Sequence, residues 1–261
     1  MAEYQMTLED RQRIARDTMA FWFETNDASF EFRAGQHADF VFTRPCMGER
    51  DNSRTFSLAS SPHDKEPIMI AMRMRKTAFK SALKAAALGT KFTVSRPRGS
   101  FTLHRDITRP AVFLAGGIGI TPIRSILQSA TQERLPHKLY LFYSNREAGD
   151  AAFIEELQSL ATQNSNFALV PTMTGHKTLA WPYEKGHINR EMLMRHLLGL
   201  NGPIYYIAGP SGMVTAISEL LKSSGVNDDD IRTEEFGDYK LPQDSAQGDQ
   251  TTSNNRSDSA L

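Results

Sequence analysis

Cysteine, net charge and long apolar runs are what this chain has least of. Cys46 is the only cysteine in 261 residues, which excludes an internal disulfide, a four-cysteine iron–sulfur site and a cysteine-based zinc site. The formal net charge is zero, which argues against general nucleic-acid binding. The longest apolar run lies within residues 111–123, far short of the roughly 20 residues that a membrane span needs.

The remaining bulk properties are ordinary. The chain start has no basic patch followed by an apolar core, so we expect no signal peptide and a cytoplasmic protein. The seven histidines lack the close spacing of a metal site, so no metal is expected. Hydrophobic residues make up 40% and charged residues 23%, which is typical of a soluble globular protein. A length of 261 residues suits two domains of about 100–150 residues each.

Basic side chains are concentrated in residues 54–109, which hold twelve Lys and Arg but only three Asp and Glu. Two interpretations are open. The segment is either a solvated basic surface or an electropositive dock for anionic groups, such as a cofactor pyrophosphate or an acidic redox protein.

The first hundred residues are β-rich, with short aromatic or β-branched runs separated by turn residues. The predicted strands are 19–24, 38–42, 55–58, 68–72 and 91–95. This pattern favours a small antiparallel β-barrel. One helix is predicted at 78–87, with Thr77 as its N-cap and Gly89 just past its end.

After Pro110 the pattern changes to alternating strands and helices. The predicted strands are 111–115, 138–143, 167–172 and 204–208, and the helices are 122–132, 152–163, 190–198 and 212–223. This alternation predicts a doubly wound, Rossmann-like α/β domain. We therefore expect a barrel domain at 1–106 and an α/β domain at 107–240. Residues 241–261 lack aromatic residues and are rich in small polar ones, which predicts a disordered tail.

A glycine-rich turn follows the apolar strand 111–115. Gly116 and Gly117 allow a sharp turn and a close approach of ligand to backbone. Thr121 is placed to cap the next helix, and Pro122 suits its first turn. The free N–H groups there would form an anion site suited to a pyrophosphate. A simple tight turn is the alternative.

Two further segments carry features of a phosphate and flavin site. In Arg54-Thr55-Phe56-Ser57, Arg54 and Phe56 share one face of a strand, and Thr55 and Ser57 share the other. Arginine can pair with phosphate, and an aromatic ring can cover a flavin. The alternative is a half-buried strand with one exposed arginine. Residues 73–80 join a basic strand end to a helix N-terminus, which is either a phosphate seat or a solvated cap.

The order of four segments resembles the ferredoxin–NADP reductase superfamily. The segments are Arg54 to Ser57, the helix from Thr77, Gly116 to Pro122, and Ala208 to Met213. Gly35-Gln36 and Glu234-Glu235-Phe236 also fit. The resemblance covers roughly residues 10–240 and is specific for the superfamily rather than for one member. It implies a flavin-binding barrel followed by an NAD(P)-binding α/β domain.

By that resemblance the first domain would bind FAD, the flavin that the family mostly uses. Arg54 would contact the FAD pyrophosphate, Phe56 would stack on the isoalloxazine, and Ser57 would approach its N5 atom. The segment from 73 to 80 would hold the ring edge and phosphates. The full set of candidate flavin contacts is Arg54, Thr55, Phe56, Ser57, Arg73, Met74, Arg75, Thr77, Lys80 and Phe236.

The second domain would bind NADPH or NADH. Its candidate contacts are Gly116, Gly117, Gly119, Thr121, Pro122, Arg146, Gly209, Pro210 and Met213. Thr121 and the Gly209-Pro210 turn would lie beside the nicotinamide. Arg146 could bind a 2′-phosphate, which favours NADPH, or could pair with Glu147 or Asp150. Lys177 is a second candidate for the 2′-phosphate.

Glu234 and Phe236 stand where the family places groups near the flavin. A carboxylate there could tune proton delivery, so Ser57 and Glu234 are the candidate catalytic residues. The alternative is an exposed acidic stretch. Tyr239 is a further candidate to cover the flavin.

Two departures from the family pattern matter. Phe56 stands where tyrosine is common, which removes a hydroxyl but keeps the stacking face. Ala208 stands where cysteine often precedes Gly-Pro, beside the nicotinamide, and this change could slow or tune hydride transfer.

The resemblance implies an enzyme that passes electrons from NAD(P)H through FAD to a separate acceptor. The basic first domain favours an acidic ferredoxin or flavodoxin, and the terminal component of an oxygenase is another candidate. One alternative is a reductase of a diffusible acceptor such as free flavin, quinone or dioxygen. Another is a flavin-binding electron-transfer or regulatory subunit without efficient hydride transfer.

Overall fold

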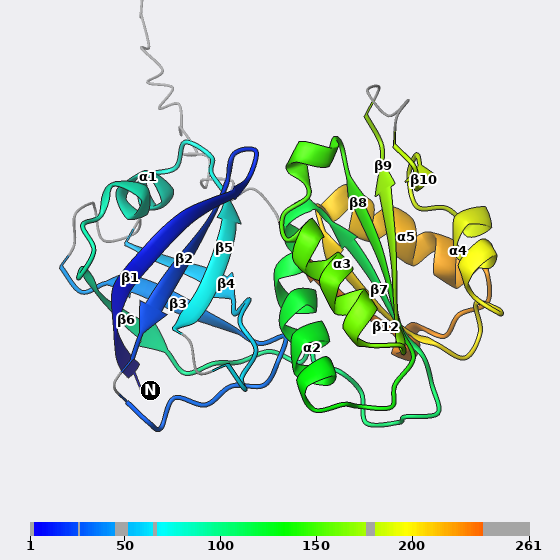
Figure 1. Ribbon diagram of the computed structural model, residues 1–261, viewed down its shortest axis with the longest axis horizontal. Helices are drawn as coiled ribbons and strands as arrows, with labels where there is room; N and C mark the ends of the chain where they lie inside the picture. The colour runs from blue at the N-terminus through cyan, green and yellow to red at the C-terminus, as the bar shows by residue number, and fades with distance from the viewer. Residues whose placement is uncertain (1–2, 26, 45–51, 65–66, 176–180, 237–261) are drawn as a thin grey trace, which may run out of the picture.

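The computed structural model describes residues 3–25, 27–44, 52–64, 67–175 and 181–236. Two sheets lie side by side, one built from the first part of the chain and one from the second (Figure 1). The tail predicted to be disordered, together with Lys177 and Tyr239, lies outside the described residues. In the described part, no helix is both long enough and apolar enough to cross a membrane.

The first sheet is antiparallel, as the barrel prediction requires, with strand order β4-β3-β6-β1-β2-β5. Its strands are β1 (Glu3–Ala15), β2 (Thr18–Glu24), β3 (His37–Phe42), β4 (Ser53–Ser57), β5 (Ile68–Arg73) and β6 (Lys91–Ser95). Alternate side chains point inward to a phenylalanine-rich core that includes Phe21, Phe23, Phe40 and Phe92. Strand β1 is not predicted from the sequence, because only its first half alternates between buried and exposed residues.

Helix α1 (Ala78–Ala85) interrupts the first sheet between β5 and β6. Thr77 caps it as predicted, since its Oγ1 accepts a hydrogen bond from the Lys80 N–H at 3.4 Å. Phe79 and Leu83 attach the helix to the phenylalanine-rich core. The end of β5 and the start of α1 are thereby held at one end of the first sheet (Figure 1).

The second sheet is parallel, with strand order β10-β9-β8-β7-β11-β12. Its strands are β7 (Ala111–Gly116), β8 (Leu139–Asn145), β9 (Phe167–Met173), β10 (Glu184–Lys185), β11 (Ile204–Gly209) and β12 (Ile231–Glu235). Every residue of β7 and β11 is buried, as expected for central strands covered on both faces. The edge strands β10 and β12 are not predicted from the sequence.

Helices cover both faces of this sheet, which confirms the doubly wound prediction. Helices α2 (Ile120–Gln132) and α3 (Ile154–Gln163) pack on one face. Helices α4 (Arg190–His196) and α5 (Ser211–Ser223) pack on the other (Figure 1). The strand order runs outward in both directions from β7, so the carboxyl end of β7 is the topological switch point where such folds bind ligands.

Candidate functional site

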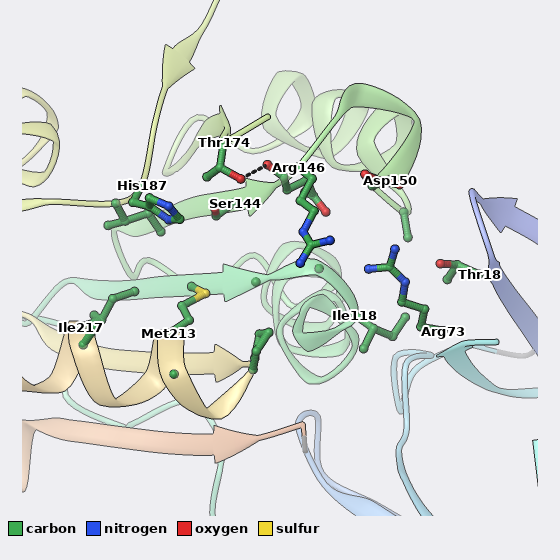
Figure 2. Close-up of a pocket in the computed structure, with 18 of the residues that line it drawn as sticks. Thr18, Arg73, Ile118, Ser144, Arg146, Asp150, Thr174, His187, Met213 and Ile217 are labelled. Carbon is green, nitrogen blue, oxygen red and sulfur yellow. Dashed lines mark hydrogen bonds between the residues drawn. The ribbon is translucent and has the colours of Figure 1, made fainter. Parts of the chain in front are cut away.

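A cavity of about 520 Å³ lies at the carboxyl ends of β7, β8 and β11 (Figure 2). Its second-sheet wall includes Gly116 and Gly117 at the end of β7, Arg146 after β8, and Met213 on α5. The opposite wall comes from the first sheet and consists of Thr18, Arg73 and Arg75. A ligand bound at the switch point of the second sheet would therefore touch both halves of the molecule.

Glycine is required at different positions of the turn from β7 to α2 for different structural reasons. A Cβ on Gly116 would lie 2.3 Å from Met213 Sδ, and one on Gly119 would lie 2.2 Å from the Ala208 carbonyl oxygen. These two glycines allow α5 and β11 to pack closely. Gly117 has a left-handed φ of +53°, and a Cβ there would meet no atom within 4 Å. Gly117 therefore borders open space in the cavity wall.

The predicted helix cap at Thr121 is wrong. A 3₁₀ turn, η2 (Gly117–Gly119), leads directly into α2, so Gly119 holds the cap position and Thr121 lies in the first turn. The Thr121 hydroxyl donates to the Ile118 carbonyl at 3.1 Å. Pro122 does lie in the first turn, as predicted. No side chain of the described residues caps this helix, which leaves its positive end to an anion.

Two arginines enter the cavity from opposite walls. Figure 2 shows the guanidinium groups of Arg73 and Arg146 pointing toward one another. Within the described part of the chain, neither group has a carboxylate partner, and Asp150 is paired instead with Arg16 at 3.7 Å. Facing cations are stabilised by an anion between them, and arginine suits the oxygens of a phosphate.

One buried polar side chain in the cavity wall also lacks a hydrogen-bond partner among the described residues. Asn145 is buried, and neither its Oδ1 nor its Nδ2 has a hydrogen-bond partner among the described residues. Because buried polar groups are normally hydrogen-bonded, this amide is suited to a ligand. The arginines, the uncapped helix and Asn145 together fit a dinucleotide that carries several phosphate groups.

Several cavity residues are not predicted from the sequence. They are Thr18, Ser144, Asn145, Asp150, Ala152, Thr174, His187, Ile188, Gly212, Ala216 and Ile217. Ser144 and Asn145 end β8 and Thr174 follows β9, and this position at the carboxyl ends of parallel strands could have found them. His187 lies in the segment before α4, and no sequence signal separates it from the other histidines.

The Arg54–Ser57 segment forms β4. The Phe56 ring lies 5.8 Å from the Phe79 ring, and the Arg54 guanidinium lies 5.9 Å from the same ring, measured between centroids and Cζ. Arg54 and Phe56 therefore share a face, as the strand alternation predicts. Thr55 is exposed and donates a hydrogen bond to Asp39.

A cluster of cations surrounds this face. Lys80 Nζ donates to the Arg73 carbonyl at 2.8 Å. Burial lowers the pKa of Lys80, and the positive charges of Arg75 and Arg54 lower it further. A nearby phosphate would relieve this repulsion, so the cluster fits the pyrophosphate of a flavin dinucleotide. Met74 packs against the core of the first sheet.

The two candidate catalytic residues meet across the two sheets. Ser57 Oγ donates to Glu234 Oε1 at 2.6 Å, although 177 positions separate them in sequence. Burial raises the pKa of Glu234, while the Ser57 hydrogen bond lowers it in part. Glu234 Oε2 is buried and has no hydrogen-bond partner in the described residues. This oxygen is therefore an enclosed acceptor without a donor, at the end of β4.

The remaining predicted residues lie on β11, on and just after β12, and at the start of α5, next to the Ser57–Glu234 contact. Glu234 pairs with Ala208 across β11 and β12, and the Phe236 N–H donates to the Gly209 carbonyl at 2.9 Å. Pro210 and Met213 line the cavity at the start of α5. Gly209 and Gly119 lie in the close contact between β11 and η2. The structure thus gathers the predicted residues into a cavity, a cationic flavin face and the Ser57–Glu234 contact.

Family models match both halves of the chain. Residues 5–103 match the oxidoreductase FAD-binding domain, and residues 113–219 match the oxidoreductase NAD-binding domain. The toluate 1,2-dioxygenase electron transfer component of Pseudomonas putida is 25% identical over 237 residues, covering 90% of this chain and 68% of that protein. A component of the Na⁺-translocating NADH-quinone reductase of Idiomarina loihiensis is 27% identical, covering 70% of this chain and 48% of that protein.

Solved structures share the whole two-sheet architecture. The Amycolatopsis cytochrome P450 reductase superposes with a TM-score of 0.79 at 22% identity, covering 91% of this chain and 70% of that one. The FAD/NAD-binding domain of a Vibrio cholerae nitric oxide dioxygenase has a TM-score of 0.78 at 19% identity, covering 90% of this chain and 99% of that one. The chain spans about half the length of the NADH-quinone reductase relative.

Proposed function

The chain belongs to the ferredoxin–NADP reductase superfamily as an FAD-dependent NAD(P)H oxidoreductase, and we propose that it passes electrons to a separate acceptor. The observation that carries this proposal is the shared cavity. The wall that would bind the coenzyme belongs to the second sheet. The opposite wall, with Arg73 and Arg75, belongs to the first sheet and lies beside the residues that would bind the flavin. When bound together, the nicotinamide supplies a hydride and the flavin accepts it and releases electrons singly.

The residues divide into two sets around this cavity. Arg54, Arg75 and Lys80 would hold the flavin phosphates, and Phe56 would cover the ring. Gly117, the start of α2 and Met213 would hold the nicotinamide dinucleotide. We add Arg73 to this second set, because its side chain lines the cavity opposite Arg146.

The Ser57–Glu234 pair would hold a proton beside the flavin. Ser57 donates its hydroxyl proton to Glu234, and burial keeps that carboxyl readier to take up a proton than an ordinary one. A carboxyl whose pKa is raised by burial holds a proton to higher pH than an ordinary one, which suits general acid–base work. We assign Glu234 that role and Ser57 the role of the hydroxyl that reaches the flavin.

For the acceptor, we favour an acidic ferredoxin or flavodoxin, with the terminal component of an oxygenase as another protein acceptor. The segment 54–109 has an excess of basic residues, and four of them, Arg54, Arg73, Arg75 and Lys80, gather at the flavin face, where they would attract an acidic carrier. The relatives include a dioxygenase electron transfer component, which by its name serves a separate partner. NADPH is the favoured coenzyme, because Arg146 enters the cavity without a carboxylate partner in the described residues. We place the reaction in the cytoplasm.

The first test is an absorption spectrum of the purified protein, followed by anaerobic titration with NADPH and then NADH. We expect a flavin spectrum that one of the coenzymes bleaches. A colourless protein that cannot take up FAD would contradict the proposal. A yellow protein that neither coenzyme bleaches would favour a flavin-binding subunit without hydride transfer. Ala208, which stands where the family often has cysteine, offers a reason for such a loss.

A further inference from the structure

Helix α2 is attached to the first sheet by a row of polar contacts. Arg124 Nη1 donates to the Ala59 carbonyl at 2.5 Å, and Ser125 Oγ donates to the Ser60 carbonyl at 2.6 Å. At the far end of the helix, Ser61 Oγ donates to Gln132 Oε1 at 2.5 Å. The three partners are therefore consecutive residues of the loop between β4 and β5. They follow Ser57, the last residue of β4, after a single intervening leucine.

The loop that receives these contacts is also held from its other side. The Ala59 N–H donates to the Met69 carbonyl at 2.8 Å, and the Met69 N–H donates to Ser60 Oγ at 3.1 Å. The loop is thus fixed between β5 and α2. A displacement of α2 would be transmitted through this loop to Ser57.

Arg124 is the central residue of the contact. It is only 9% exposed, and its guanidinium also binds both carboxylate oxygens of Glu156, with Nε–Oε2 at 3.1 Å and Nη2–Oε1 at 2.9 Å. Its Cζ lies 4.8 Å from the centroid of the Phe153 ring. A buried arginine is tolerated only when its charge and donors are satisfied in this way. The pairing therefore fixes the guanidinium in one geometry.

Phe153 adds an apolar wedge to the same place. It packs with Ile118 against the outer side of the first sheet, where Ala20, Ala59 and Met69 form a small cluster. Its φ is +61°, a left-handed conformation that is unusual for an aromatic residue. Such a conformation persists only where the surroundings hold it, which here are the first sheet and Arg124.

We propose that this set of contacts, the α2 seam (Arg124, Ser125, Gln132, Phe153 and the loop 59–61), sets the spacing between the nicotinamide and flavin rings. The seam joins the start of α2, where the coenzyme would bind, to the end of β4, where Ser57 would meet the flavin. Arg124 is then a positioning residue that touches neither cofactor. The inference rests on the proposed function.

Ring spacing has a measurable consequence, because hydride transfer is sensitive to small misplacements of the reacting atoms. The test uses FAD-loaded Arg124→Met and Ser125→Ala variants, with Arg195→Met as the matched control. Arg195 also forms a two-pronged pair with a glutamate, Glu184, but lies on α4 away from the seam. Three quantities are measured anaerobically: the rate of flavin reduction, the long-wavelength charge-transfer absorption of the stacked rings, and the coenzyme Kd.

We expect flavin reduction to slow about tenfold or more in Arg124→Met and about threefold in Ser125→Ala, with a weaker charge-transfer band in both. Coenzyme Kd and flavin content should stay within about twofold, because the seam touches neither cofactor. An Arg124→Lys variant, which keeps a donor for the Ala59 carbonyl, should recover part of the rate. Arg195→Met should match the wild type in all three measurements.

The seam proposal is overturned if Ser125→Ala, which removes only one hydroxyl, and a folded Arg124→Met both keep the wild-type rate and band. It is also overturned if Kd rises in step with the loss of rate, since the seam would then build the coenzyme site. Should Arg124→Met not fold, Ser125→Ala decides alone. Failure of the proposed function looks different, because the wild type itself would then not be reduced by either coenzyme.

Discussion

At the scale of single residues, the site depends on charges placed where only a partner makes them favourable. Arg73 and Arg146 face one another across the cavity, and Glu234 is half-buried with one enclosed oxygen lacking a hydrogen-bond partner among the described residues. Each arrangement costs stability in the empty protein and is relieved by a bound group. Substituting these residues should therefore weaken ligand binding without weakening the fold.

Glu234 gives a stability prediction with a definite sign. Burial raises the pKa of Glu234, so the folded protein binds this proton more tightly than the unfolded chain does. Stability therefore falls as pH rises from the ordinary carboxyl pKa of about 4.3 through the raised value. Glu234→Gln should raise the Tm at pH 8, by about 2–4 °C for each kcal/mol recovered, with a gap that closes toward pH 4.

The measurement is the Tm of the FAD-loaded protein across this pH range. Glu235→Gln is the matched control, because Glu235 is the exposed neighbour on the same strand. A gap between wild type and Glu234→Gln that widens as pH falls would contradict the raised pKa of Glu234.

Arg146 determines the predicted coenzyme preference. A charged hydrogen bond to the 2′-phosphate contributes about 1.5–3 kcal/mol, so Arg146→Ala should raise the KM for NADPH about tenfold to a hundredfold. The KM for NADH should change little. Steady-state kinetics with both coenzymes tests this, with Arg190→Ala as an exposed control on α4. Equal effects on both coenzymes would mean that Arg146 binds a part that NADPH and NADH share.

At the scale of elements, the turn from β7 to α2 offers two glycines with different roles. Gly119→Ala would place a methyl 2.2 Å from the Ala208 carbonyl oxygen, a backbone atom that cannot move aside alone. We expect a loss of about 3 kcal/mol in the free energy of unfolding. Gly117→Ala meets no atom within 4 Å and should cost only about 1–2 kcal/mol for its left-handed φ.

Coenzyme binding should separate the two variants further. The methyl of Gly117→Ala would project toward the cavity, so its coenzyme Kd should rise although the fold survives. Denaturant unfolding and coenzyme titration of both variants test this pair. Equal stability losses would show that the close packing of η2 on β11 is less strict than the structure indicates.

The elements also show what the sequence could reveal. The central strands are predictable because burial on both faces leaves a continuous apolar run, as in β7. Strands β1 and β12 escape prediction because charged residues occupy much of their length. The predicted cap at Thr121 is wrong because η2 starts the helical path earlier. Spacing along the chain cannot show that Arg73, at the end of β5, faces Arg146 in the second half.

At the scale of the whole molecule, charge is divided in a way that the zero net charge conceals. Residues 54–109 carry twelve basic and three acidic side chains, and the exposed members include Arg75, Lys76, Lys84 and Lys91. This segment also holds β4, α1 and the cationic flavin face. An acidic carrier would therefore be drawn to the side of the molecule where the flavin would release its electrons.

Salt should separate this docking step from the chemistry inside the cavity. The screening length falls from about 10 Å at 0.1 M salt to about 3 Å at 1 M. Electron transfer to an acidic ferredoxin or flavodoxin should then slow by about tenfold or more, as expected for an electrostatically steered encounter. Flavin reduction by saturating coenzyme should change far less, and so should transfer to a neutral quinone.

Lys84→Glu, which alters an exposed residue of α1, should weaken transfer to the carrier at low salt and leave quinone reduction unchanged. Transfer to the carrier that is insensitive to salt would show that the basic segment is only a solvated surface, and a diffusible acceptor would become the better account of the enzyme.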